Sequence, residues 1–82
     1  MAKRIKKEIL NYTVIFEPTE EGGFVVHVPA LSGCHTQGET FDEAYKMAQD
    51  AIWGYIQTLQ DLKEEIPRED EHSIIAKIPV KV

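Results

Sequence analysis

The sequence has little cysteine and no long apolar run, and each absence excludes a class of protein. Its one cysteine, Cys34, cannot form a disulfide within the chain, so we expect the reducing environment of the cytoplasm. No apolar stretch approaches the roughly 20 residues that a membrane-spanning helix needs, and no signal-peptide core follows the first residues. We therefore expect a cytoplasmic protein that does not enter a membrane.

The sequence also lacks an excess of basic residues, because its formal net charge is −5. Generic binding to the phosphates of nucleic acids needs a basic face, so direct binding of DNA or RNA is not expected. The negative charge suits a basic partner instead. Residues 1–8 are basic, and we expect them to be partly disordered; solvated terminal charge is a more common role for such a stretch than a DNA-contacting arm.

The length of 82 residues predicts one domain over residues 1–82. A domain of this size buries only about 60–65% of the surface that its unfolded chain exposes. We therefore expect modest stability, which self-association would increase.

The longest regular pattern in the sequence is an amphipathic helix that begins at Phe41. Thr40 is a candidate N-cap, and Glu43 can complete a capping box with it. Apolar residues recur every three or four positions, the period of one helix face. They are Phe41, Ala44, Tyr45, Ala48, Ala51, Ile52, Tyr55, Ile56, Leu59 and Leu62. The helix should end by Glu65, because Pro67 cannot continue it.

Alternating apolar residues predict strands at residues 10–17, 24–28 and 73–82, and a short third strand at residues 34–39 precedes the helix. Gly22 and Gly23 can take the positive φ of a tight reversal, so the first two strands should form an antiparallel hairpin. The residues expected to face inward are Tyr12, Val14, Phe16, Phe24, Val26 and Val28.

The predicted fold is α+β, with the order strand, strand, strand, helix, strand. A right-handed crossover would place the last strand parallel to the first, which gives a four-stranded mixed sheet of order 3-2-1-4 with the helix on one face. This order is similar to the first half of a ribonuclease-H-type fold. Such nucleases hold two metal ions with clustered carboxylates, and neither the middle of the first strand (residues 12–15) nor the last strand from Ser73 onward contains one. We therefore predict no nuclease activity.

One helix can cover only one face of such a sheet, so the opposite face should be bare. Ile15, Val25 and Ile75 are predicted to form an apolar patch there, which a partner or a second copy would cover. Scattered surface apolar residues are the alternative. Trp53 falls on the polar face of the helix, with Met47 at the border of the apolar stripe, and aromatic residues in such places are enriched at interfaces.

No residue pattern predicts a catalytic site, a metal or a cofactor. Cys34 and His35 are adjacent in a strand and should point to opposite faces, and His27 and His72 have no ligand spacing to them. We expect Cys34 to be a small buried apolar residue. No glycine-rich phosphate loop is present either, so we predict a protein that is not an enzyme.

Six segments are similar to the HicB-like antitoxin family, in an order that covers residues 10–80. They are residues 12–17 (YTVIFE), 21–24 (EGGF), 29–34 (PALSGC), 36–40 (TQGET), 50–52 (DAI) and 65–67 (EIP). The resemblance implies a small α+β domain that forms a homodimer or a higher homo-oligomer. It also implies a HicA-type toxin as partner, a small basic ribonuclease whose catalytic histidine and RNA surface the antitoxin masks.

Many HicB proteins also carry a C-terminal DNA-binding module of the helix-turn-helix or ribbon-helix-helix type. No such module follows the last predicted strand, so we do not expect autorepression through one. The alternative function is therefore an orphan HicB-like domain, an oligomeric binding or scaffold module without a toxin.

An acidic antitoxin can compete with RNA for a basic nuclease. The candidate contacts lie at the hairpin and along the helix, although solvated charge is the more common role of such residues. They are Glu17, Glu20, Glu21, Asp42, Asp50 and Asp61.

Overall fold

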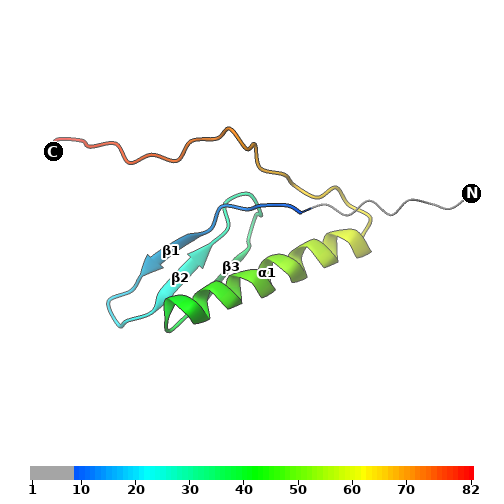
Figure 1. Ribbon diagram of the computed structural model, residues 1–82, viewed down its shortest axis with the longest axis horizontal. Helices are drawn as coiled ribbons and strands as arrows, with labels where there is room; N and C mark the ends of the chain where they lie inside the picture. The colour runs from blue at the N-terminus through cyan, green and yellow to red at the C-terminus, as the bar shows by residue number, and fades with distance from the viewer. Residues whose placement is uncertain (1–8) are drawn as a thin grey trace, which may run out of the picture.

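The computed structural model describes residues 9–82 and contains a three-stranded sheet with one long helix (Figure 1). The elements are β1 (Ile15–Pro18), β2 (Phe24–His27), β3 (His35–Gly38) and α1 (Phe41–Asp61). Both strand pairs are antiparallel, in the order β1-β2-β3, and α1 covers one face of the sheet. The predicted α+β class is confirmed. The expected disorder of residues 1–8 lies outside the described residues.

The hairpin between β1 and β2 turns on two glycines. Gly22 and Gly23 have φ of 92° and 82°, the left-handed region that glycine adopts without steric cost. The Gly22 N–H donates to the Thr19 carbonyl and the Thr19 N–H donates to the Gly23 carbonyl, both at 3.1 Å. The predicted antiparallel hairpin is therefore confirmed.

The helix begins at Phe41, directly after the predicted N-cap residue Thr40. The Glu43 N–H donates to the Thr40 Oγ1 at 3.1 Å, so Thr40 is the N-cap. The Glu43 carboxylate accepts from the Glu39 N–H at 3.4 Å, one residue earlier than the expected capping box.

The helix ends at Asp61, four residues before the predicted limit. Lys63 has a φ of 57°, and its N–H donates to the Gln60 carbonyl while the Glu64 N–H donates to the Leu59 carbonyl. These two bonds form a Schellman motif. The sequence signal for this end was weak because the left-handed position, usually glycine, is a lysine here.

The core lies between the sheet and α1 in two adjoining clusters. The first has Val26, Ala44 and Ala48 at its centre, and the second has Val28, Leu31 and Cys34. All six inward-facing strand residues predicted from the alternation pack into one cluster or the other. Close packing at β3 requires a glycine, because a Cβ on Gly38 would lie 2.5 Å from the Ala44 nitrogen.

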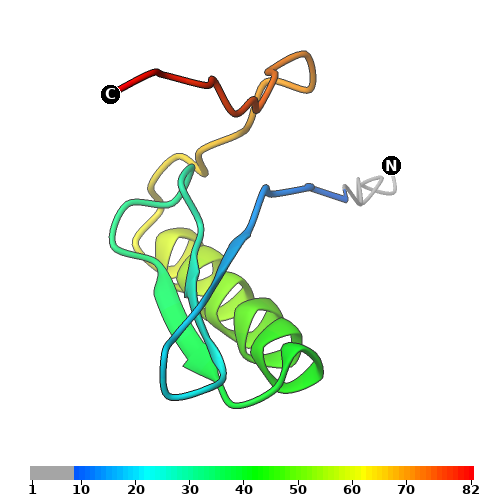
Figure 2. The same cartoon turned by 90° about the vertical axis from the view of Figure 1, so that its left-hand side faces the viewer.

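The predicted fourth strand is not part of the sheet. Residues 73–82, here called the arm, form no strand in the part of the chain that the structure describes, and both views show the arm clear of the sheet (Figures 1 and 2). The order 3-2-1-4 and the ribonuclease-H-like detail are therefore not shown. Alternation in the sequence identifies a segment that suits a strand, but it does not identify the strand beside which that segment pairs.

Candidate acidic binding surface

The structure gathers four glutamates around one hollow of about 1060 Å³ beside the hairpin. Glu20 and Glu21 come from the β1–β2 turn, and Glu39 and Glu43 come from the junction of β3 and α1. We call this feature the acidic hollow. Its lining residues are Thr19, Glu20, Glu21, Gly22, Gly23, Phe24, Val25, Gln37, Gly38, Glu39, Glu43 and Met47.

Two local features bring these glutamates together. The tight turn at Gly22 and Gly23 folds the tip of the hairpin towards the end of β3, where a Cβ on Gly23 would lie 2.7 Å from the Gly38 carbonyl oxygen. The absence of a side chain on Gly38 lets the first turn of α1 lie against β3. Carboxylates that are distant in sequence therefore share one surface.

The described residues that line the acidic hollow give it a negative charge. Among residues 9–82, no lysine or arginine lines it, and all four glutamates are exposed. The Glu43 carboxylate is partly engaged by the Glu39 N–H. Four carboxylates within one hollow create a negative potential that attracts cationic groups over about 8–10 Å at physiological ionic strength. The charge of the hollow therefore suits contact with a basic surface.

An apolar strip adjoins the acidic hollow. Val25 and Met47 line the hollow itself, and Met47 is 42% exposed. Ile15, 41% exposed, lies opposite His27 in the sheet register, while Glu17 lies opposite Val25. The outer face of the sheet is thus partly apolar, as the sequence predicted for its first two strands.

Glu17 is already paired within the chain. Its Oε1 lies 3.2 Å from the His27 Nε2, across the β1–β2 ladder on the outer face. Both side chains remain about half exposed, so this contact leaves the face accessible.

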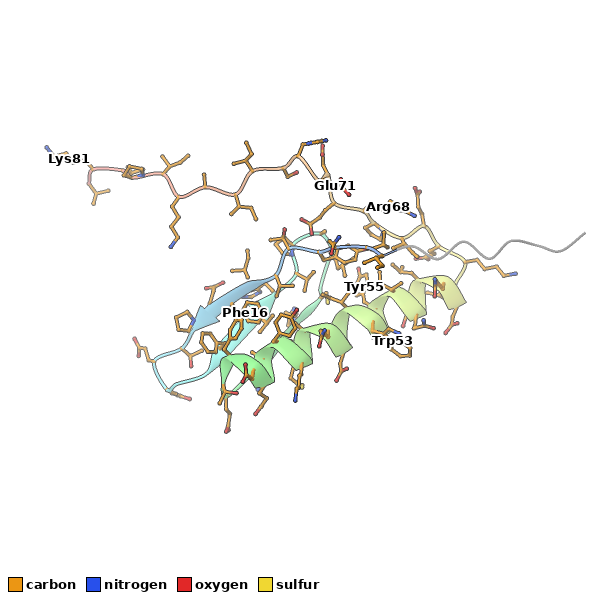
Figure 3. The ribbon with its side chains drawn as sticks, viewed as in Figure 1. Phe16, Trp53, Tyr55, Arg68, Glu71 and Lys81 are labelled. Carbon is orange, nitrogen blue, oxygen red and sulfur yellow. The ribbon has the colours of Figure 1, made fainter. Side chains whose placement is uncertain are left out.

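The remaining predicted contacts lie elsewhere. Trp53 is 68% exposed and points away from the sheet, whereas Tyr55 points towards the strands and donates to the Ser32 carbonyl at 2.8 Å (Figure 3). Asp50 lines a second, smaller hollow beside Gly54 and Cys34. Ile75 lies in the arm, 72% exposed, and not on the face of the sheet where it was predicted.

Sequence reasoning missed two of the four glutamates of the hollow. The sequence predicts Glu43 only as part of the helix cap and Glu39 only as the end of the third strand. The available signal was the run Gly38-Glu39-Thr40, because a glycine two residues before an N-cap allows a strand end and a helix start to pack closely.

The cysteine of this chain lies in the core and does not line the acidic hollow. Cys34 is 7% exposed, and burial raises the pKa of its thiol, which disfavours the reactive thiolate. The prediction that Cys34 is a buried apolar residue is confirmed. Within residues 9–82, no group of three or more His, Cys, Asp or Glu side chains is arranged to hold a metal ion.

The sequence of this chain matches one protein family over most of its length. The model for "HicB_like antitoxin of bacterial toxin-antitoxin system" matches residues 12–79. This chain belongs to the HicB-like antitoxin family. The match confirms the resemblance noted in the sequence, and it includes the hairpin, all three strands, α1 and most of the arm.

Several curated relatives of this HicB-like antitoxin domain match most of its length. A UPF0150 protein of Synechocystis sp. is 44% identical over 64 residues, which are 78% of this chain and 81% of the relative. A UPF0150 protein of Thermoplasma acidophilum is 46% identical over 65 residues, 79% of this chain and 94% of the relative. Antitoxin HicB 1 of Photorhabdus laumondii is 40% identical over 58 residues, 71% of this chain but 37% of the relative.

The described part of this HicB-like chain offers no helix that could cross a membrane.

Proposed function

We propose that this HicB-like domain is a non-enzymatic, cytoplasmic antitoxin that binds a HicA-type, mRNA-cleaving toxin and occludes its RNA-binding surface. The observation that carries the proposal is the acidic hollow, in which Glu20, Glu21, Glu39 and Glu43 share one accessible surface. Its family membership supplies the kind of partner.

The physical basis is competition for a basic surface. An RNA-cleaving toxin must present positive charge to RNA phosphates, and the same charge attracts an acidic protein. Complementary charge raises the rate of encounter and fixes the orientation of the complex. Once docked, the antitoxin excludes RNA without any chemical step.

Apolar residues next to the hollow would hold the docked state. Met47 and Val25 lie within the hollow and Ile15 lies on the adjoining sheet face. Methionine adapts its shape to an irregular partner surface, and burial of these side chains would slow dissociation. We assign Glu17, Glu20, Glu21, Val25 and Met47 to this toxin-facing surface.

The outer surface of α1 is a second proposed contact. Trp53 is highly exposed, and a Cβ on the neighbouring Gly54 would meet no atom of residues 9–82 within 4 Å beyond its local helix backbone and chain neighbours. An exposed tryptophan beside open backbone is suited to contact with another molecule. We propose that Trp53, with Asp50 one turn earlier, contacts either the toxin or another copy of this chain.

A second candidate function is an orphan oligomeric scaffold without a toxin. The specific observation in its favour is that the Synechocystis and Thermoplasma relatives, which this chain matches over most of their length, carry no antitoxin name. Antitoxin HicB 1 of Photorhabdus laumondii, in contrast, is matched over only 37% of its length.

Co-expression with the product of the adjacent gene separates the two functions. If that product arrests growth, the antitoxin proposal predicts that this chain relieves the arrest and co-purifies with it. The variant Glu20→Lys/Glu21→Lys should lose the relief, while Glu64→Lys/Glu65→Lys, with the same charge change on exposed residues after α1, should keep it. Growth arrest that this chain does not relieve would reject the antitoxin function and favour the scaffold.

A further inference from the structure

The arm is an unusual segment for a small domain because its apolar side chains are exposed to solvent. Ile74, Ile75, Ile78 and Val80 are between 72% and 89% exposed. Ile74, Ile78 and Val80 recur at even spacing with Ala76 and Val82, the two-residue period of a strand with one apolar face. A contiguous exposed apolar segment indicates a surface that another molecule covers.

Local hydrogen bonds fix where the arm departs from the domain. The Tyr12 hydroxyl donates to the Pro67 carbonyl at 2.6 Å, and the Glu69 carboxylate accepts from both the N–H and the hydroxyl of Thr13. These contacts tie residues 67–69 to the segment that enters β1. The beginning of the arm is therefore anchored although the arm itself is not packed.

A turn after this anchor directs the arm away from its own sheet. The Ser73 N–H donates to the Asp70 carbonyl at 3.1 Å, and the His72 N–H donates to the Asp70 Oδ1 at 2.8 Å. Beyond the turn, the arm runs in the same direction as β1 but at a distance from it (Figures 1 and 2). The arm is thus an extended segment that pairs with no strand among the described residues.

The same sheet has an edge that an added strand could extend. β1 pairs only with β2 in the order β1-β2-β3, so the other side of β1 is an edge among the described residues. An exposed edge offers its N–H and C=O groups to an extended segment from another chain. Strand addition there would also bring apolar arm residues beside Ile15 on the outer face.

The positive charge of the arm indicates which molecule supplies the strand edge with which the arm pairs. The arm contains Lys77 and Lys81 and no acidic residue, whereas residues 9–72 contain 13 acidic residues against three lysines and arginines. A cationic arm is attracted to this acidic domain and repelled by a basic toxin. The partner that fits the arm is another copy of this chain.

We infer that two copies of this chain exchange their arms, so that the arm of each copy pairs as a strand with the β1 edge of the other. A two-fold dimer of this kind is closed, because each copy gives one arm and receives one. Pro79 lacks an N–H and is confined to an edge strand, so the added arm would end the sheet and discourage further strand addition. The inference is independent of any toxin.

Sedimentation of the purified chain tests the dimer. We expect a dimer at micromolar concentration that Ile78→Lys weakens at least tenfold in Kd, while Leu62→Lys, at an exposed apolar residue after α1, leaves the Kd unchanged. The helical circular dichroism signal confirms that each variant is folded. A monomeric parent chain, or a dimer that Ile78→Lys leaves intact, would overturn the inference.

Reversal of the arm's charge provides a second variant. Lys77→Glu/Lys81→Glu keeps every apolar residue of the arm, and we expect it to weaken the dimer more at 50 mM than at 500 mM NaCl, because salt screens the repulsion (about 14 Å against about 4 Å Debye length). Equal dimerisation of this variant and the parent chain at low salt would contradict the choice of the acidic domain as partner.

Disulfide trapping shows whose edge the arm occupies. A chain carrying Glu17→Cys is mixed with a chain carrying Ile78→Cys, each with Cys34→Ala, and the mixture is oxidised after exchange. We expect a disulfide-linked pair that contains one chain of each kind. A chain that carries both Glu17→Cys and Ile78→Cys is also oxidised at high dilution. An intramolecular disulfide in a monomer would show that the arm packs on its own sheet, and this result would overturn the proposed exchange.

Discussion

Gly38 and Gly54 should respond in opposite directions to the same substitution. At Gly38 a Cβ would lie 2.5 Å from the nitrogen and 2.6 Å from the Cα of Ala44, both backbone atoms of α1. At Gly54 a Cβ would meet no described atom within 4 Å outside its local helix backbone and chain neighbours. The added methyl group therefore forces α1 away from β3 in one variant and enters open space in the other.

The two magnitudes follow from packing and helix propensity. Overpacking of a core contact typically lowers the free energy of unfolding by about 1–3 kcal/mol. Alanine also lowers the conformational entropy of the unfolded chain, which stabilises the folded state by roughly 0.4–1 kcal/mol. Gly38→Ala should therefore lower the free energy of unfolding by roughly 1–2 kcal/mol. Gly54→Ala should raise it by about 1 kcal/mol, because alanine replaces glycine in a helix interior. In a domain of this size, 1 kcal/mol corresponds to a shift in Tm of about 4–8 °C.

The assay is urea and thermal unfolding followed by the helical circular dichroism signal. All chains must be compared at one protein concentration, because self-association raises apparent stability. An unchanged or higher Tm for Gly38→Ala would refute the close β3–α1 contact on which the geometry of the acidic hollow depends. A lower Tm for Gly54→Ala would show that the space beside Gly54 is filled in solution.

Three further predictions concern the ends of α1 and the buried thiol. Thr40→Ala should lower the free energy of unfolding by about 1 kcal/mol through loss of the N-cap bond to the Glu43 N–H, and an unchanged urea midpoint would contradict that cap. Lys63→Gly should raise the free energy of unfolding by up to about 1 kcal/mol, since glycine adopts the positive φ at this position without strain; a lower midpoint would contradict the observed helix end. Burial raises the pKa of the Cys34 thiol in the folded state, so its contribution to stability is complete below the ordinary thiol pKa and is lost as the pH rises through the folded pKa. The free energy of unfolding should therefore fall between pH 8 and pH 10, and the fall should be smaller in Cys34→Ala; an equal fall in both chains would contradict the burial of the thiol.

The parts of the fold that depend on local patterns could be predicted from the sequence. The cap at Thr40, the turn at Gly22 and Gly23 and the inward rows of β1 and β2 each follow from a signal within a few residues. The end of α1 at Asp61 could not be predicted, because the left-handed position that terminates it is occupied by Lys63.

Features that depend on contacts between distant segments were less predictable. The alternation in residues 73–82 indicates a strand but contains no information on its neighbour, so the fourth strand of the predicted sheet is absent from the described structure. The sequence predicts two of the four glutamates of the acidic hollow as candidate contacts. Its hairpin glutamates are conspicuous in the sequence, but Glu39 joins them only because the glycine before it allows β3 and α1 to meet.

The most direct measurement of antitoxin action is a titration of the purified toxin's RNA cleavage with this chain. We expect inhibition that is complete at a fixed stoichiometry, with an affinity that falls as salt rises because acidic residues contact a basic surface. Glu20→Lys/Glu21→Lys should weaken inhibition at least tenfold, and Glu64→Lys/Glu65→Lys should not. Cleavage that continues at full rate with excess antitoxin, or equal inhibition by both variants, would contradict occlusion through the acidic hollow.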